Sequence, residues 1–429
     1  MVWDSIYYVD IARYGWKFEH YYAFFPLLPA IMGLSPSHLL PVVAIGLSVA
    51  ASVMSAVLLY WLTLKVLGSE RHAATASLVY ILGPASLFHS VAYTESLFTA
   101  LTLAGLGMLY CRHSLVGAAV CFHLACWTRS NGIVNAGYLM HYALSRPIAS
   151  YVRTRQGEAA LRASRAAEVT AQAGDLAWAV AVSTLAVSPF WAFQAAGHDV
   201  FCNARDSIIS FMDSGDSHSA MAAAGWAGSD PVHSSSSSSM DGRSPWCGSV
   251  LGMYGSVQDR YWGVGLGRYY TMQQIPNFLL AAPALALSVA GVVCYFLACK
   301  SHMLSGGFTA LTGAKAVPTE RLRKVKAVQE NSATSGIFTD GVAVHIYPWA
   351  FQTAVALLVM HVQVATRFLS CCPPLHWFTS HLLLTRKLGS KTTTSEQLFG
   401  QRLPMILWFY CACYTLVGST LFSNFYPWT

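Results

Sequence analysis

The stretch from residue 269 to residue 299 reads YYTMQQIPNFLLAAPALALSVAGVVCYFLAC, and it contains no Asp, Glu, Lys or Arg. Its 31 residues exceed the number that an α-helix needs to cross the hydrocarbon core of a bilayer, which is about 20. The whole chain has the same character, because 55% of its 429 residues are hydrophobic, 10% are charged and the mean hydropathy is +0.45. A soluble domain carries about 25% charged residues, and a disordered chain is poor in apolar ones. The composition therefore excludes both classes and indicates a multi-pass membrane protein.

Several other stretches are equally free of charge. The long ones cover residues 20–64, 72–94, 176–198, 341–366 and 403–429, and shorter ones cover 96–111, 113–128 and 130–145. We expect the long stretches to cross as helices and the shorter ones to form short or tilted helices. Residues 373–384 are too few to cross unless the protein buries part of their backbone. The alternation typical of an outer-membrane β-barrel is absent, so the sequence predicts an all-α multi-pass membrane protein with a single integral membrane domain over residues 1–429.

The basic residues predict which side of the membrane each connecting segment occupies. If the helices alternate in direction, 18 of the 26 Lys and Arg residues fall on the side that holds 145–175 and 300–344. Because basic residues accumulate on cytoplasmic loops, we predict that 145–175 and 300–344 are cytosolic basic loops. Residues 1–40 are then a first lumenal loop with interfacial helices, and 197–275 are a second lumenal loop. The N-terminus would lie in the lumen with no signal peptide ahead of it, so we expect a first transmembrane helix to be missing from this sequence.

The second lumenal loop has features of its own. Six consecutive serines, Ser234–Ser239, mark a low-complexity insert that we expect to be disordered. Cys202 and Cys247 flank this insert, and an oxidising lumen would allow them to form a disulfide. The sequence contains neither CxxC nor HExxH spacing. We therefore predict no metal site.

Acidic and aromatic residues crowd the first lumenal loop. Trp3 and Asp4 open it, Asp10 follows, and Glu19 and His20 come before the first long apolar stretch. One interpretation is an interfacial amphipathic helix with a belt of Trp and Tyr residues. The functional interpretation is a carboxylate that acts as a base beside aromatic rings that stack on sugars.

Further polar residues stand beside uncharged stretches on the same predicted side. Glu95, which follows Tyr93, is the only charged residue between residues 72 and 111, and an acid there is costly unless it faces water or a partner. Arg129 and Arg367 are isolated arginines at predicted helix ends, and each either extends its head to the interface or binds a phosphate. A last polar group contains Tyr261, Trp262, Arg268, Gln274 and Asn277. Together these groups suggest a lumenal active site.

These groups, in this order along the chain, closely resemble the GPI mannosyltransferase 2 family. The matching residues are Trp3-Asp4-Ser5, Ile11-Ala12, Gly15, Glu19-His20, Ala23-Phe24-Phe25-Pro26, Tyr93-Thr94-Glu95-Ser96-Leu97-Phe98, Arg129-Ser130-Asn131-Gly132, Tyr261-Trp262, Gly265, Arg268-Tyr269-Tyr270, Gln274-Ile275-Pro276-Asn277-Phe278, Thr366-Arg367-Phe368 and Pro427-Trp428-Thr429. The resemblance implies a GT-C glycosyltransferase-like transmembrane helix bundle in the endoplasmic reticulum membrane, with its active site in lumenal loops. It also implies transfer of the second mannose, in α-1,6 linkage, from dolichol-phosphate-mannose to the GPI anchor precursor. The Ser-rich insert is not part of the family pattern.

The implied reaction suggests roles for the matching residues. In this family a β-linked mannosyl phosphate gives an α-linked product, so one inverting displacement suffices. A carboxylate should accept the proton of the attacking 6-hydroxyl, and we assign this role to Asp4, with Asp10 and Glu19 as alternatives. The phosphate leaving group needs cations, for which Arg367, Arg268 and Arg129 are the candidates. Substrate contacts are assigned to Trp3, Glu19, His20, Tyr93, Glu95, Tyr261, Trp262, Gln274 and Asn277.

The resemblance also sets expectations about partners. They are the dolichol-phosphate-mannose donor, the GPI-precursor glycolipid acceptor, membrane lipids and a small membrane accessory subunit. We expect no cofactor, no metal and no nucleic acid. Two alternatives stay open: another GT-C glycosyltransferase that uses a polyprenyl-phosphate sugar, and a membrane transporter or scramblase. The sequence shows no clear internal repeat and its charges gather at lumenal helix ends, which favours an enzyme over a transporter.

Overall fold

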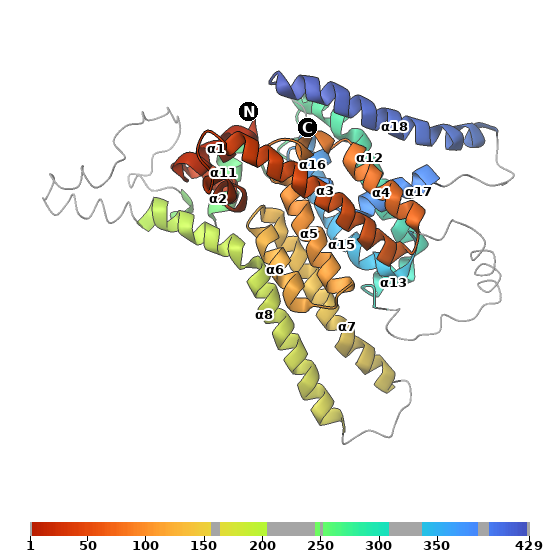
Figure 1. Cartoon of the computed structure of the whole chain (residues 1–429). Helices are drawn as coiled ribbons and strands as arrows, with labels where there is room; N and C mark the ends of the chain where they lie inside the picture. Colours follow the sequence, from red (N-terminus) through yellow and green to blue (C-terminus); the bar gives the residue numbers. More distant parts are fainter. Residues whose placement is uncertain are drawn as a thin grey trace, which may run out of the picture.

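A computed structural model describes residues 2–155, 164–203, 245–248, 252–308, 337–384 and 394–426, and within these ranges every regular element is helical (Figure 1). The predicted all-α membrane fold class is therefore confirmed. The Ser-rich run 234–239 and the basic segment 309–336 lie outside the described residues. The predicted loop 145–175 consists largely of the ends of α7 (Ala136–Arg155) and α8 (Ser164–His198).

In the described part of the chain, four helical stretches are long and apolar enough to span a membrane. They are Leu40–Leu67, Leu176–Cys202, Met272–Ala298 and Arg402–Ser423. The first and the last lie in α3 (Leu40–Leu67) and α18 (Thr394–Ser423), and most of the other two lies in α8 and α12 (Ile275–Ala298). Three shorter apolar helices, α5 (Glu95–Tyr110), α6 (Leu115–Cys126) and α15 (Ala343–Leu358), pack against them. Each of these seven helices lies mostly within one uncharged stretch of the sequence, although α3, α5, α8 and α18 also include charged residues.

Some uncharged stretches form shorter helices than their length suggested. Residues 20–64 first form the short helices η1 (Glu19–Ala23) and α2 (Leu27–Gly33), and α3 follows. Residues 72–94 form α4 (Glu70–Leu82), which ends at Gly83 because the next residue, Pro84, disfavours helical backbone in the residue before it. The remainder folds into η2 (Ser86–His89). Beyond α15, the chain breaks into η9 (Val362–Val364) and α16 (Ala365–Leu369).

The helix α17 (Pro373–Leu384) is the segment that the sequence marked as too short to cross unaided. It lies inside the bundle, where Trp377 is 1% exposed and its indole N–H donates a hydrogen bond to Thr63 Oγ1 at 2.7 Å. Neighbouring helices approach closely here, since a Cβ atom at Gly291 would lie 2.3 Å from the Trp349 ring. The protein therefore buries α17, which satisfies the condition for a short segment at membrane depth.

The two ends of the described chain lie side by side (Figure 1). The Trp3 indole donates a hydrogen bond to the carbonyl of Phe422 in α18 at 3.3 Å, and its ring lies 6.1 Å from the ring of Phe425. Trp3 has a φ of 53°, which residues with a side chain rarely adopt. These contacts hold a strained residue directly before α1 (Asp4–Tyr14), which packs on α2 and α3.

Candidate functional site

An ion pair joins Asp4, near the N-terminus, to Arg367, which lies far along the chain. Asp4 is the first residue of α1, where a negative charge is favoured by the helix dipole. Arg367 lies on the short helix α16, and its Nη1 donates a hydrogen bond to Asp4 Oδ2 at 2.7 Å. Asp4, the predicted base, and Arg367, a predicted phosphate-binding residue, are thus direct neighbours although they are 363 residues apart in the sequence.

A second acid and a second arginine extend this pair into a cluster of four charges. Glu95 is the first residue of α5, and its Oε1 lies 2.6 Å from Nη1 of Arg129 and 3.5 Å from Nη1 of Arg367. Arg129 directly precedes the 3-10 helix η3 (Ser130–Asn135), after α6. The four charges therefore alternate in sign, from Asp4 through Arg367 and Glu95 to Arg129. We call these four residues the charged cluster.

Burial differs along the charged cluster. The side chain of Glu95 is 3% exposed, whereas those of Arg367, Arg129 and Asp4 are 19%, 20% and 32% exposed. Burial alone would lower the pKa of Arg367, but the carboxylates of Asp4 and Glu95 outweigh it and raise that pKa above its ordinary value. Glu95 is thus an internal anchor for the two guanidinium groups. Asp4 stands at the accessible end.

Aromatic and hydroxyl groups surround the charged cluster. The guanidinium of Arg367 lies 5.3 Å from the centre of the Tyr93 ring and 5.7 Å from that of Phe88, which is within the range of a cation–π interaction. The backbone N–H of Asp4 donates to the hydroxyl of Tyr93 at 3.2 Å. The Tyr93 side chain therefore contacts both members of the Asp4–Arg367 pair.

Two residues of this site were not among those assigned from the sequence as substrate or catalytic residues. Thr94 Oγ1 accepts a hydrogen bond from Arg129 Nη1 at 3.3 Å and lies 3.1 Å from the hydroxyl of Tyr8. Tyr8 is 7% exposed. The available signal was helical spacing, because Tyr8 is one turn after Asp4 and therefore shares its face of α1.

Arg367 contacts both carboxylates through the same nitrogen. Its Nη1 is the atom that faces Asp4 and Glu95. In the described part of the chain, no protein group hydrogen-bonds to its Nε or Nη2. A planar guanidinium can bind two oxygens of a phosphate through such a pair of N–H groups. The arrangement is therefore chemically able to bind an anionic oxygen beside a carboxylate.

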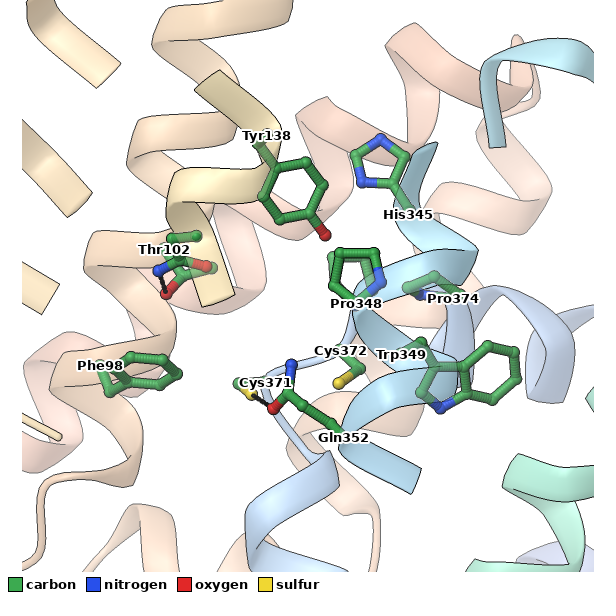
Figure 2. A pocket seen from close by; sticks show the side chains of 12 residues that line it. Phe98, Thr102, Tyr138, His345, Pro348, Trp349, Gln352, Cys371, Cys372 and Pro374 are labelled. Atoms are coloured by element: carbon green, nitrogen blue, oxygen red, sulfur yellow. Dashed lines mark hydrogen bonds between the residues drawn. The ribbon is translucent and has the colours of Figure 1, made fainter. Parts of the chain in front are cut away.

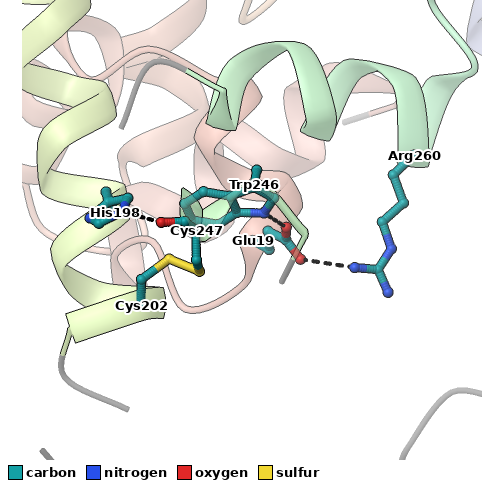
Figure 3. Close-up of a disulfide and its surroundings, with 6 residues drawn as sticks. All are labelled: Glu19, His198, Cys202, Trp246, Cys247 and Arg260. Carbon is teal, nitrogen blue, oxygen red and sulfur yellow. Dashed lines mark hydrogen bonds and ion pairs between the residues drawn. A yellow bond between two sulfur atoms is a disulfide. The ribbon is translucent and has the colours of Figure 1, made fainter. Parts of the chain in front are cut away.

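The structure places Glu19 in a different cluster (Figure 3). Its Oε1 accepts a hydrogen bond from the Trp246 indole, and its Oε2 accepts one from the Tyr261 hydroxyl at 3.0 Å and lies 3.5 Å from Arg260 Nη1. Burial and the charge of Glu19 raise the pKa of Tyr261 to about 12. Cys247 follows Trp246 and forms a disulfide with Cys202, with their Cα atoms 5.7 Å apart. We call the residues around Glu19, together with this disulfide, the Glu19 clamp.

The remaining residues assigned from the sequence do not contact the charged cluster. Arg268 pairs with Asp259, and both side chains are about half exposed. Asp10 accepts a hydrogen bond from the Tyr21 hydroxyl. The amide of Asn277 donates to Gln274 Oε1 at 2.6 Å, at the start of α12.

The aromatic residues of the first segment pack beside the Glu19 clamp. The ring of His20 lies 5.3 Å from that of Tyr261 and stacks on Phe18 at 5.6 Å, and burial lowers the pKa of His20. Trp262 packs edge-on against Phe24 at 6.0 Å. Among the described residues, no group of three or more His, Cys, Asp or Glu side chains is arranged to hold a metal ion.

Comparison with known proteins identifies the family. The chain matches the family model described as Mannosyltransferase (PIG-V) over residues 1–429. It is 30% identical over 475 residues to GPI alpha-1,6-mannosyltransferase 2 of Cricetulus griseus, with 100% of this chain and 87% of that protein covered. Identity to the Homo sapiens protein of the same name is 28% over 474 residues, with 100% and 87% covered. The chain is 27% identical over 461 residues to GPI mannosyltransferase 2 of Drosophila melanogaster, with 100% of this chain and 86% of that protein covered.

No solved structure matches the chain at a significant level. The family resemblance seen in the sequence is confirmed by the match over the full chain. The chain belongs to the PIG-V family of mannosyltransferases.

Proposed function

We propose that this protein transfers the second mannose, in α-1,6 linkage, from dolichol-phosphate-mannose to the GPI anchor precursor at the lumenal face of the endoplasmic reticulum membrane. The observation that carries the proposal is the Asp4–Arg367 pair, in which the carboxylate of Asp4 lies 2.7 Å from the guanidinium of Arg367. A guanidinium is a group that binds phosphate, and the chain belongs to the PIG-V family. The GPI-directed activity rests on the names of the relatives.

The proposed reaction is a single inverting displacement. The 6-hydroxyl oxygen of the acceptor attacks the anomeric carbon of the donor mannose, and the bond from that carbon to the phosphate oxygen breaks with its electron pair on the phosphate. Asp4 accepts the hydroxyl proton as general base. Arg367 stabilises the extra negative charge of the leaving dolichyl phosphate, with Arg129 as a second cation. A lipid monophosphate that is neutralised by arginines does not require a metal ion.

The position of Arg367 supports a lipid-linked donor. Thr366, the residue before it, lines an apolar cavity of about 50 Å³ between α4, α12, α17 and α18. The other lining residues include Val79, Ala284, Leu287 and Leu407, which are apolar. Arg367 itself does not line this cavity, so the lipid chain of a phosphate on Arg367 would reach the apolar lining past Thr366.

The direct test is an assay of mannosyl transfer. Microsomes that contain this protein, from cells otherwise lacking second-mannose addition, should transfer labelled mannose from dolichol-phosphate-mannose to the one-mannose GPI precursor. The same expression should restore GPI-anchored proteins at the cell surface. A chain that reaches the membrane but restores neither would refute the proposed function. Transfer to a different glycan acceptor would instead support the other GT-C glycosyltransferase.

A further inference from the structure

Gln352 is a polar residue that neither the sequence assignments nor the proposed reaction uses. It lies on α15, within the uncharged stretch 341–366, and is 7% exposed. A buried side-chain amide in an apolar helix is costly unless it has hydrogen-bond partners. The partners of Gln352 therefore indicate what its amide group does.

Both partners belong to segments that carry an arginine of the charged cluster. Gln352 Oε1 accepts a hydrogen bond from Asn131 Nδ2 at 3.4 Å, and Asn131 is two residues after Arg129. The same oxygen accepts a hydrogen bond from Cys371 Sγ at 3.6 Å, and Cys371 is four residues after Arg367. One amide oxygen thus connects η3 with the turn that follows α16.

The surroundings of Gln352 show that this connection is internal (Figure 2). Gln352 and Cys371 line a cavity of about 10 Å³, and Tyr138 lies across it (Figure 2). Asn131 has a second buried polar atom, Oδ1, which has no hydrogen-bond partner among the described residues. Loss of the bond to Gln352 would leave the buried Asn131 amide with no partner among these residues and free to reorient.

We propose that Gln352 is a positioning residue that fixes the segments of Arg129 and Arg367 relative to each other, so that both guanidinium groups face one donor phosphate. The inference rests on the proposed function, since it deepens the account of that phosphate site. Gln352 itself does not touch the reacting groups. It acts through Asn131 on one side and Cys371 on the other. Small displacements of groups that position a substrate reduce catalysis strongly, by up to about 100-fold for 1 Å.

The test uses variants of the complete membrane-bound protein. Gln352→Met keeps the size of the side chain but removes the hydrogen-bond acceptor, and the adjoining cavity gives the new side chain room. We expect KM for dolichol-phosphate-mannose to rise by about tenfold, while KM for the GPI precursor stays unchanged. The matched control is Thr353→Val on the same helix. Thr353 is 4% exposed and bonds only within its helix, to the Trp349 carbonyl at 2.8 Å, so its donor KM should stay within about twofold of wild type.

A double variant separates positioning from general damage to the fold. If Gln352 acts through Asn131, then Asn131→Leu combined with Gln352→Met should be no more impaired than the worse single variant. Donor KM values that multiply in the double variant would overturn the proposal. An unchanged donor KM in Gln352→Met would do the same.

A binding measurement keeps this test independent of the transfer reaction. Dolichyl phosphate should raise the melting temperature of the detergent-solubilised wild type, and Gln352→Met should need about ten times more of it for the same shift. If the wild type and Thr353→Val bind dolichyl phosphate about ten times more tightly than Gln352→Met but transfer no mannose, the proposed function fails and the positioning role stands. Equal stabilisation of wild type and Gln352→Met, or of neither, refutes the positioning role.

Discussion

Glu95 is the most buried member of the charged cluster, and it contacts both arginines. A buried carboxylate is tolerated when positive charges compensate it, and removing one partner leaves an uncompensated charge. The assignment of Glu95 as a substrate contact stays a prediction, and its contacts with Arg129 and Arg367 indicate a different role. We infer that its main role is to hold Arg129 and Arg367 side by side.

We therefore predict a large effect of Glu95→Gln. Two guanidinium groups would share a partly buried site without the carboxylate between them, and the free energy of unfolding should fall by about 3 kcal/mol. Thermal unfolding in detergent measures this change, and mannosyl transfer should fall with it. Adding Arg129→Met to Glu95→Met should recover stability without recovering transfer. A Glu95→Gln protein of normal stability and activity would contradict the anchoring role.

The substitution Arg367→Lys tests whether the guanidinium shape matters. Lysine keeps the positive charge and can still pair with Asp4, but it cannot offer two parallel N–H groups to a phosphate. We expect the variant to be expressed normally and to lose mannosyl transfer by at least about tenfold. Steady-state transfer at several donor concentrations measures this loss. Full activity would leave Arg367 as an interfacial anchor that only extends its charge towards water.

Only part of the site can be predicted from local sequence. Glu95 stands out because a lone acid among apolar residues must have a partner or water. The identity of that partner cannot be read locally, because Arg129 and Arg367 are brought to Glu95 by the packing of separate helices. Gln352 could not be predicted as a functional residue, because a neutral polar residue in an apolar stretch does not by itself indicate a site.

At the scale of elements, absence of charge predicts where helices lie better than where they end. The uncharged stretch 269–299 contains α12, which begins at Ile275 and continues through Pro283. The stretch 72–94 is equally free of charge, but α4 ends within it at Gly83, directly before Pro84. Hydropathy measures the cost of exposure to water, whereas helix ends depend on backbone conformation. The charged residues of the site lie at helix ends and on short helices, since Glu95 is the first residue of α5 and Arg367 lies on the five-residue helix α16.

The Glu19 clamp ties three separate segments together. Glu19 precedes α2, Trp246 and Cys247 lie in η5 (Pro245–Gly248), and Tyr261 lies on α11 (Met253–Trp262). The disulfide from Cys247 to Cys202 adds η4 (Asp199–Asn203), which follows α8. These contacts hold the first segment of the chain, which begins with α1, against later elements. Both carboxylate oxygens of Glu19 have protein partners, whereas among the described residues only Oδ2 of Asp4 has one, so Glu19 is a weaker candidate for the base than Asp4.

We predict that Cys202→Ser destabilises the protein without altering the chemistry. The disulfide closes a loop with a sequence separation of 45 residues, and a native bridge of this kind contributes about 2–4 kcal/mol. The melting temperature should fall, while kcat measured below that temperature should stay within about twofold. The matched control is Cys111→Ser, because Cys111 is free and exposed. Equal melting temperatures for the two variants would mean that the clamp does not depend on the disulfide.

At the scale of the whole molecule, the account requires the charged cluster and the Glu19 clamp to face the same compartment. The excess of basic residues in 145–175 and 300–344 predicts that those segments face the cytosol. Protease added to sealed microsomes should then cleave within 300–344 and spare 197–275. Cleavage of 197–275 in intact vesicles would reverse the orientation and would contradict the lumenal site.

The central claim is that Asp4 accepts the proton during mannosyl transfer. The most direct measurement is kcat for transfer from dolichol-phosphate-mannose in microsomes with Asp4→Asn, compared with Asp10→Asn and Glu19→Gln. Asparagine keeps the size of Asp4 but cannot accept the proton, and general-base catalysis contributes about 10²–10⁴-fold. The account predicts a loss of that size for Asp4→Asn at normal protein levels, and a much smaller loss for the other two. An active Asp4→Asn protein beside an inactive Asp10→Asn or Glu19→Gln protein would contradict the assignment.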